Sequence, residues 1–310
     1  MHREIVDGRT AGRPLLAHLR DRGGPLGEAE WRALILAGAV RVDGAAADPG
    51  AILRAGQHLT FERPPWEEPA APLCTAVLHE DPDLLAVAKP RGLPTLPGGG
   101  AFQDHTLLAV VRRRDPGAVP MHRLGRHTSG IVLFARTARA RSAVQAQLRE
   151  RRVGKTYRAL CAGHPPWDDL EIDAPIGEVP HAPTGTVHAA LADGRASRSR
   201  ARVLERRAGS APTSLLEVEI STGRPHQIRI HLAWAGHPLA GDPLYGPGGV
   251  PRPGSGAVPG DPGYRLHALR LELSHPRDGR PLRLECAAPP DLRPGRGTTI
   301  LPPETNPETP

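Results

Sequence analysis

The sequence is poor in cysteine and in aromatic residues. Cys74, Cys161 and Cys286 are its three cysteines, and no two of them form a C-x-x-C pair, which argues against a disulfide framework and a thiolate zinc site. Four Trp, three Tyr and three Phe are the aromatic residues among 310, so a core must be mainly aliphatic. No run approaches the ~20 apolar residues that span a bilayer, and the N-terminal MHREIVDGRT has no apolar signal region. These absences predict a cytoplasmic protein without membrane contact.

Lysine is also scarce, although the chain is basic. Among 40 Lys and Arg residues, only Lys89 and Lys155 are lysines, and the net charge is +7 with a sequence pI of about 10.1. A basic surface favours a polyanionic partner, and the planar guanidinium group of arginine suits phosphates and base edges. Charge alone is equally compatible with a basic protein that binds no nucleic acid, and a GC-rich genome also produces an arginine bias.

Local patterns divide the chain into four parts. Residues 1–62 contain two short helices with apolar faces, an Asp-Gly hairpin turn and a closing strand, and this order resembles the ribosomal-protein-S-four-like RNA-binding domain. Residues 63–78 are a proline-rich linker, and residues 79–290 form the main domain. Residues 291–310 have too few apolar side chains to pack and are expected to be a disordered tail.

In the main domain, strand patterns outnumber helix patterns. Two amphipathic runs, residues 138–149 and 225–235, predict helices. Seven aliphatic or alternating runs predict strands, so an α+β fold with a mixed or antiparallel central sheet and flanking helices is expected rather than alternating βαβ units. The predicted strands are residues 84–88, 131–135, 156–162, 199–205, 215–221, 266–273 and 282–286.

Five ordered segments of the main domain carry basic, hydroxyl and aromatic side chains. Their patterns are KPxGLP from Lys89, HRLxxxTSG from His122, KxYRAL from Lys155, TGRxHQIRxHLAxxGHPxxGDxxYG from Thr222 and LHAxxLxxxHP from Leu266. Each residue taken singly also has a structural explanation, such as a turn lysine or a core tyrosine. In this order, from residue 84 to residue 284, the segments resemble the RluA-like family of RNA pseudouridine synthases.

The resemblance implies an isomerase that detaches uracil from a uridine in ribosomal or transfer RNA and rejoins it through carbon, without cofactor or metal. It implies that Tyr157 faces the base and that Arg229 pairs with a catalytic aspartate. The target nucleotide must leave its stack to enter the pocket, at a cost of a few kcal/mol. A monomer is expected. The RNA contacts are expected from Lys89, His122, Arg123, Arg126, Thr128, Ser129, Lys155, Arg224, His226 and Gln227.

The sequence departs from the family where the aspartate should follow HRL, because Gly125 stands there. Glycine cannot act as acid, base or nucleophile. Either another carboxylate, Asp242 or Asp104, reaches the site, or the protein binds RNA without catalysis, or the chemistry is altered. Both carboxylates also have structural explanations, in a turn and at a helix start. His127 is a weaker candidate, since a histidine suits proton transfer but lacks the negative charge. Isomerisation is the first hypothesis, and an inactive RNA-binding protein is the alternative.

Other enzyme classes fit less well. HQIRIH from His226 lacks the His-Glu-x-x-His spacing of zinc hydrolases, and GGG at residues 98–100 is not followed by the Lys-Ser of a P-loop. The GxSxG pattern of a serine hydrolase is absent around Ser129. The sequence therefore predicts no metal site and no nucleotide cofactor.

Overall fold

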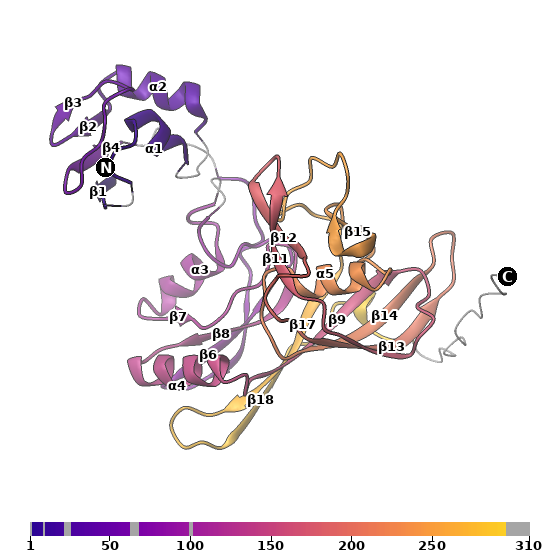
Figure 1. Ribbon diagram of the computed structural model, residues 1–310. Helices are drawn as coiled ribbons and strands as arrows, with labels where there is room; N and C mark the ends of the chain where they lie inside the picture. The colour runs from indigo at the N-terminus through magenta and orange to yellow at the C-terminus, as the bar shows by residue number, and fades with distance from the viewer. Residues whose placement is uncertain (1, 9, 22–25, 63–67, 99–101, 296–310) are drawn as a thin grey trace. The chain divides into compact units, whose positions relative to one another are not determined.

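The computed structural model describes residues 2–8, 10–21, 26–62, 68–98 and 102–295. The chain divides into two compact units (Figure 1). The first comprises residues 1–70 and 96–106, and the second comprises residues 71–95 and 107–310. The first unit thus includes a segment from further along the chain, which a division into consecutive ranges did not predict.

The first unit packs two helices against a small antiparallel sheet. The helices are α1 (Leu15–Asp21) and α2 (Glu28–Leu36). The strands, in the order β1-β4-β2-β3, are β1 (His2–Ile5), β2 (Val40–Val42), β3 (Ala45–Ala46) and β4 (His58–Phe61). Asp43 (φ 52°) and Gly44 (φ 81°) are left-handed, as the two-residue hairpin turn between β2 and β3 requires. Both helices, the hairpin and the closing strand β4 were predicted, whereas β1 was not.

The second unit is built on one ten-stranded sheet with the order β10-β13-β14-β9-β17-β8-β6-β5, in which β18 also pairs with β17 and β7 with β8. Strands β8 and β17 are parallel and the other neighbouring pairs are antiparallel, so the predicted mixed sheet is confirmed. The strands are β5 (Ala76–Glu80), β6 (Leu84–Lys89), β7 (Val119–Pro120), β8 (Ser129–Ala135), β9 (Gly154–Ala162), β10 (Asp169–Ile172), β13 (Ser199–Arg207), β14 (Thr213–Ile220), β17 (Leu266–Ser274) and β18 (Pro281–Glu285).

The central strands are buried on both faces, and each face has its own core. Along β8, Val132 and Phe134 join the core that includes α3 (Leu107–Arg114) and α5 (Gln227–Trp234). Ile131 and Leu133 alternate with them and join the core that includes α4 (Ala138–Arg149). Because successive side chains of a strand point to opposite faces, α3 and α5 cover one face and α4 covers the other.

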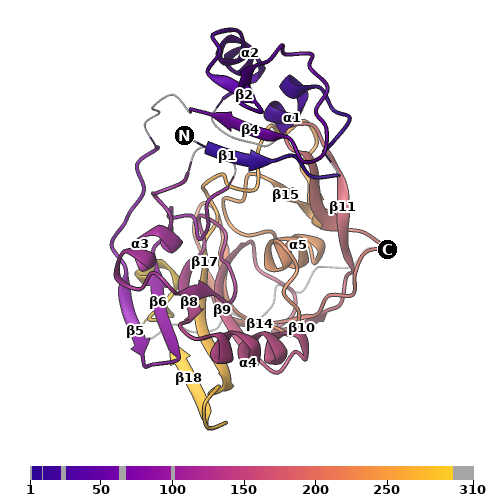
Figure 2. The ribbon, with the colours of Figure 1, turned by 90° about the vertical axis from the view of Figure 1, so that its left-hand side faces the viewer.

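Helix α5 is surrounded by short strands that lie outside the main sheet. These are the hairpin of β11 (Ile176–His181) and β12 (Gly185–Ala190), and the pair β15 (Tyr245–Gly246) and β16 (Val250–Pro251). Figures 1 and 2 show α5 beside β15 and this hairpin. Two 3-10 turns complete the unit, at Pro247–Gly249 and Pro290–Leu292.

Two boundaries differ from the predicted ones. Strand β5 begins at Ala76, inside the predicted linker 63–78, because its pairing with β6 extends the sheet beyond the aliphatic run. Leu292, inside the predicted tail 291–310, is buried with Leu215 and Ala288, so the chain packs against the sheet further than its composition indicates. Residues 63–67 of the linker and 296–310 of the tail lie outside the described residues.

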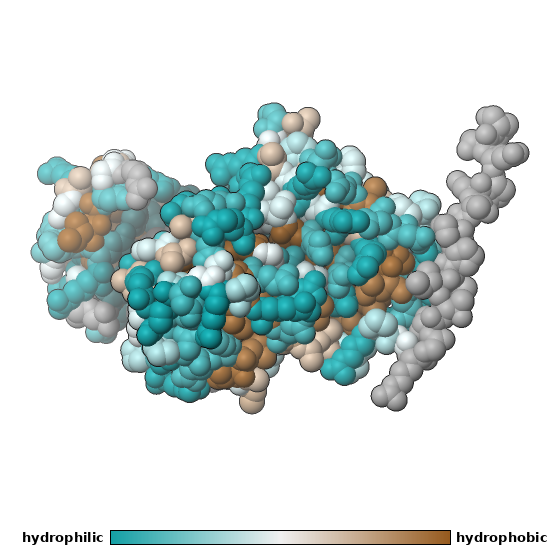
Figure 3. Space-filling model, turned by 90° about the horizontal axis from the view of Figure 1, so that it is seen from below, coloured by the Kyte–Doolittle hydropathy of each residue, from teal (hydrophilic) through white to brown (hydrophobic). Residues whose placement is uncertain are grey.

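The surface seen in Figure 3 is mostly hydrophilic, with hydrophobic residues in separate patches. All three cysteines are free, with Cys74 exposed and the other two buried. Among the helices within the described ranges, none is long and apolar enough to cross a membrane.

Candidate functional site

The candidate site is a cavity of about 100 Å³ between the HRLGRHTSG loop, the sheet and the start of α5. It gathers residues from four of the predicted motifs, although these lie far apart in the sequence. Eight predicted site residues line it, namely Arg123, Gly125, Thr128, Tyr157, Arg224, His226, Gln227 and Arg229. The remaining lining is the aliphatic Leu124, Ile220, Ile228 and Leu266, together with Tyr264, which was not predicted.

Lys89, the last residue of β6, holds the HRLGRHTSG loop through a hydrogen bond to its backbone. Its side chain is 1% exposed, and its ammonium group donates to the carbonyls of Pro90 (2.9 Å), Leu93 (2.7 Å) and Arg126 (3.1 Å). Burial lowers the pKa of Lys89 to about 7. Lys89 was expected to contact RNA. In the structure all three donor positions are used within the protein, and the RNA contact stays a prediction.

Two other loop residues also point into the protein rather than into the cavity. The Nε2 atom of His122 accepts from the backbone amide of Leu133 at 3.2 Å, and burial together with nearby Lys155 lowers the pKa of His122 to about 4. The hydroxyl of Ser129 lies 2.9 Å from Nδ1 of His267 on the neighbouring strand β17. These atoms fix the loop to the sheet, and the RNA contacts expected from both residues stay a prediction.

Arg229 is the buried charge of the site. Its guanidinium group is 2% exposed and donates through Nε and Nη2 to both carboxylate oxygens of Asp242, at 2.7 and 2.8 Å. Its Nη1 donates to the carbonyl of Pro259 at 3.0 Å. The rings of Tyr245 and Tyr264 lie 5.0 and 4.3 Å from its Cζ atom, which is the distance of a cation–π contact. These contacts hold one edge of Arg229 away from the cavity and fix its orientation.

Asp242 is fully occupied by this arrangement. Besides Arg229, its Oδ1 accepts from the amides of Leu244 (2.9 Å) and Tyr245 (3.1 Å), and its side chain is 0% exposed. It does not line the cavity, and no aspartate or glutamate is among the described residues that do. Asp104, the other predicted carboxylate, belongs to the first unit, where its amide donates to Glu68, and stays a prediction.

His226 begins α5 in a strained conformation. Its φ of 55° is left-handed, which is uncommon for a residue other than glycine and often marks a functional site. The hydroxyl of Tyr245 donates to the carbonyl of His188, so Nδ1 of His226 donates to that hydroxyl, at 2.8 Å. Burial and the charge of Arg229 lower the pKa of His226 to about 3, which keeps the ring neutral.

Gln227 and Thr222 shape the turn that leads into α5. The Gln227 side-chain oxygen accepts from the hydroxyl of Thr222 (2.7 Å) and the amide of Arg224 (3.1 Å). Its Nε2 donates to the carbonyl of Arg198 on the neighbouring loop, at 2.9 Å. Arg224 therefore has a fixed backbone at the rim of the cavity, and its Nε atom is buried without a partner among the described residues.

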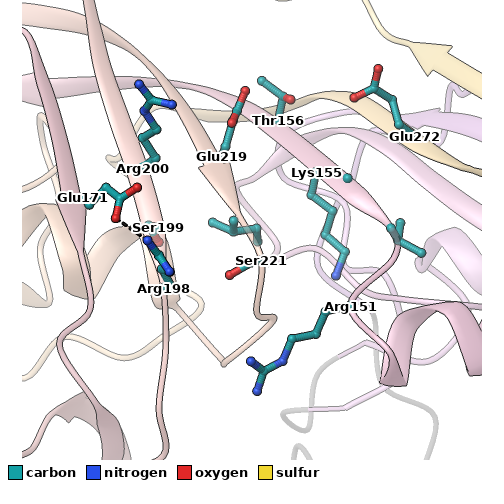
Figure 4. Close-up of a pocket in the computed structure, with 13 residues that line it drawn as sticks. Arg151, Lys155, Thr156, Glu171, Arg198, Ser199, Arg200, Glu219, Ser221 and Glu272 are labelled. Atoms are coloured by element: carbon teal, nitrogen blue, oxygen red, sulfur yellow. Dashed lines mark hydrogen bonds and ion pairs between the residues drawn. The ribbon is translucent and has the colours of Figure 1, made fainter.

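A larger cavity of about 480 Å³, lined by four cationic side chains and three glutamates, lies along strands β9, β13 and β14 (Figure 4). Lys155 and Arg151 line it, and the guanidinium group of Arg151 extends away from Lys155 in Figure 4, whereas Arg198 is paired with Glu171. Lys155 and Arg151 have no ion pair within the described part of the chain. A third cavity contains Lys155, Arg151 and Arg224, and Arg224 also lines the candidate site. Lys155, Arg151 and Arg224 therefore form a series of cationic side chains from the larger cavity to the candidate site.

Comparisons with known proteins agree with this geometry. The family described as RNA pseudouridylate synthase matches residues 83–234, which include the HRLGRHTSG loop, Tyr157 and Arg229. An uncharacterized RNA pseudouridine synthase of Synechocystis sp. is 45% identical over 247 residues, which cover 79% of this chain and 84% of that protein. The chain belongs to the RNA pseudouridylate synthase family. It is an isomerase family that acts on RNA, so the predicted family and enzyme class are confirmed.

Further relatives of this pseudouridine synthase come from plants, bacteria and humans. RNA pseudouridine synthase 5 of Oryza sativa subsp. japonica is 42% identical, covering 79% of this chain and 75% of that protein. Ribosomal large subunit pseudouridine synthase D of Nitrosomonas europaea is 38% identical, covering 66% and 59%. The solved structure of Human RNA Pseudouridylate Synthase Domain Containing 1 superposes with a TM-score of 0.58 at 26% identity, over 73% of this chain and 89% of that chain.

Tyr264 is the functional-site residue of this synthase that the sequence motifs missed. It stands two positions before the LHAxxLxxxHP segment, in a stretch that matches no motif. One compositional signal pointed to it. The chain has three tyrosines, and all of them lie at this site, because Tyr157 and Tyr264 line the cavity and Tyr245 contacts Arg229.

One buried and two half-buried histidines make the fold of the synthase sensitive to acid. Burial lowers the pKa of His231 to about 4, and those of His122 and His226 lie at about 4 and 3, against 6.5 in an unfolded chain. Since the unfolded chain binds more protons, the free energy of unfolding should be complete above pH ~6.5 and decrease as the pH falls toward 4. Thermal unfolding between pH 6.5 and 5 should show this decrease. His231→Gln should make it shallower, and an unchanged slope would contradict the assignment.

Proposed function

We propose that this protein isomerises uridine to pseudouridine in ribosomal or transfer RNA, and that the reaction takes place in the cavity beside Gly125. The observation that carries the proposal is the placement of Tyr157 and Arg229 on one cavity, at the start of a helix and beside the HRLGRHTSG loop. At about 100 Å³ the cavity is far below the ~300–1,000 Å³ of drug-sized pockets, which suits a single base turned out of its stack.

The RNA backbone is proposed to follow the cations that lead to this cavity. Lys155, Arg151 and Arg224 line cavities that share lining residues, and phosphate contacts from such residues give affinity without reading the base sequence. Burial lowers the pKa of Lys155, and a phosphate beside it would stabilise its charged form. Arg123 at the mouth of the cavity is exposed and would reach the nucleotides next to the target.

We also propose a role for the first unit, an oligomeric state and a cellular compartment. The first unit is proposed as an S-four-like RNA-binding module, on the strength of its two helices and small sheet. The protein is proposed to act as a monomer in the cytoplasm, without a cofactor. The described residues contain no group of three or more His, Cys, Asp or Glu side chains that suits a metal ion.

Nucleoside analysis of RNA tests the proposal directly. Unmodified ribosomal and transfer RNA transcripts are incubated with the purified protein, digested and separated, and pseudouridine is quantified against uridine. Pseudouridine should appear with the wild type and decrease strongly with Tyr157→Phe, since that side chain is proposed to face the base. RNA binding without pseudouridine would favour the inactive RNA-binding alternative. Full turnover by Tyr157→Phe would contradict the placement of the base.

The proposed path of the RNA backbone gives a salt-dependent prediction. Replacing Lys155 and Arg151 together by alanine should weaken RNA binding and reduce the slope of log K against log salt by about 0.7 per lost contact with a single strand. Filter binding at several salt concentrations measures both quantities. Arg141→Ala is the matched control, because Arg141 is exposed on α4 and lines none of these cavities. Equal slopes for wild type and double variant would remove this path.

A further inference from the structure

Gly125 has no side chain, and the hydroxyl group of Tyr264 lies next to the position where a Cβ atom would stand. A Cβ atom built on Gly125 would lie 3.0 Å from the hydroxyl oxygen of Tyr264 and 3.5 Å from that of Thr128. The two hydroxyls are themselves 3.4 Å apart. The first contact is tighter than nine in ten real Cβ contacts, so with a larger residue at position 125 the Tyr264 hydroxyl would have to shift by a few tenths of an ångström.

We propose that Tyr264 is the catalytic group of this enzyme and that its hydroxyl oxygen acts on the ribose of the target uridine. The inference rests on the proposed isomerisation. The Tyr264 hydroxyl supplies the reactive oxygen that Gly125 lacks. Tyr264 lines the cavity from the segment before β17, opposite the HRLGRHTSG loop. Its phenol is one of two acidic side chains there, with Tyr157, since the described lining residues include no carboxylate.

The other candidates in the lining are less suited to this role. Tyr157 is proposed to face the base, and burial raises its pKa to about 12. Nδ1 of His226 is hydrogen-bonded to the hydroxyl of Tyr245, and the low pKa of His226 leaves its ring neutral. Thr128 carries an alcohol, which is a weaker acid than a phenol, and its hydroxyl lies within hydrogen-bond reach of Tyr264.

The surroundings of Tyr264 favour negative charge on its oxygen during the reaction. The guanidinium of Arg229 lies 4.3 Å from the centre of the ring, where a cation is attracted to the electron density of the π system. That attraction grows when the oxygen gains negative charge and the ring becomes more electron-rich. The hydroxyl of Thr128 can donate to the same oxygen. Arg229 is held by Asp242, so this stabilisation is in place before the substrate binds.

The reaction balances with this phenol alone. The Tyr264 oxygen forms a bond to C1′ of the ribose while the C1′–N1 bond breaks, its electron pair stays on the uracil, and N1 takes the phenolic proton. After the free uracil turns, C5 attacks C1′, the bond between C1′ and the Tyr264 oxygen breaks, and its electron pair returns to that oxygen. The oxygen then takes the proton from C5. The net change moves one proton from C5 to N1 and consumes no oxidant or reductant.

Tyr264→Phe tests the proposal because it removes only the hydroxyl oxygen. Turnover of RNA should fall at least about 100-fold, the usual scale for loss of a proton-transferring group. RNA affinity and the unfolding midpoint should stay as in the wild type, because the ring still faces Arg229. Combining Tyr264→Phe with Gly125→Asp should restore part of the turnover, since the hydroxyl no longer competes with the new carboxylate.

Each outcome of these experiments supports or overturns the catalytic role of Tyr264. If wild type and Tyr264→Phe are equally active, Tyr264 is not the catalytic group, and the proposed isomerisation stands. If the wild type binds RNA but forms no pseudouridine in any transcript, both proposals fail. If Tyr264→Phe does not fold, Gly125→Ala replaces it, because its methyl group would crowd the hydroxyl without removing the ring. Its turnover should fall at least about tenfold, and unchanged turnover would overturn the role of Tyr264.

Discussion

Asp242→Ala is expected to lower the free energy of unfolding by about 3–5 kcal/mol, because it leaves the guanidinium group of Arg229 buried without its carboxylate. The two side chains are 2% and 0% exposed, and they are joined by two hydrogen bonds of 2.7 and 2.8 Å. Water cannot replace the lost partner at this depth. Turnover should fall as well, since Arg229 and the tyrosine rings against it would no longer be held in place.

A matched control exists on the surface of the same unit. Arg200 and Asp169 also form a bidentate pair, but their side chains are 59% and 38% exposed. Asp169→Ala should therefore cost less than about 1 kcal/mol. Urea unfolding of both variants measures the difference. Similar small losses in the two variants would show that Arg229 does not depend on Asp242 for its burial.

Gly130→Ala is expected to destabilise the protein by about 3 kcal/mol or more. Gly130 is paired with Ala268 where strands β8 and β17 run parallel, and its φ is 114°. A Cβ atom there would lie 2.2 Å from the carbonyl oxygen of Ala268 and 2.6 Å from its nitrogen. Backbone atoms cannot turn aside as a side chain can, so the cost of overpacking, about 1–3 kcal/mol, adds to the strain of a left-handed non-glycine residue.

The control for Gly130 separates the crowding from the backbone strain. Gly279 also has a positive φ, of 74°, but no atom lies within 4 Å of its Cβ position. Gly279→Ala carries the strain without the clash and should cost only about 1 kcal/mol. Because Gly130 is the last residue of the HRLGRHTSG loop, Gly130→Ala should also lose turnover, whereas Gly279→Ala should keep it. Equal losses of stability would mean that β8 and β17 can separate at little cost.

The main sheet was predictable from the sequence because its central strands are buried on both faces. Strand β8, with the sequence SGIVLFA, is buried along its whole length and therefore reads as an uninterrupted apolar run. The hairpin of β11 and β12 was missed, since it lies outside the main sheet and contains Pro180. Helix α3 is eight residues long, which is too short for an apolar period to be distinguished from a buried strand.

The sequence motifs predicted which residues come together at the site, but not which contacts each residue makes there. The motif order indicated that Tyr157, Arg229 and the HRLGRHTSG loop come together, and they do. A lysine in a turn is usually solvated, so the three carbonyls that surround Lys89 had no signature in the sequence. Tyr264 meets Thr128 across 136 residues of chain, and only the packed structure brings these two hydroxyls together.

The central claim is that this family member isomerises uridine although glycine stands at the position of the aspartate. RNA labelled with tritium at C5 of uridine tests it most directly, because the isomerisation releases that hydrogen when C5 becomes bonded to the ribose. We expect many releases per wild-type molecule and at least about 100-fold fewer with Tyr264→Phe at equal RNA binding. Bound RNA with no release of tritium by the wild type would contradict it.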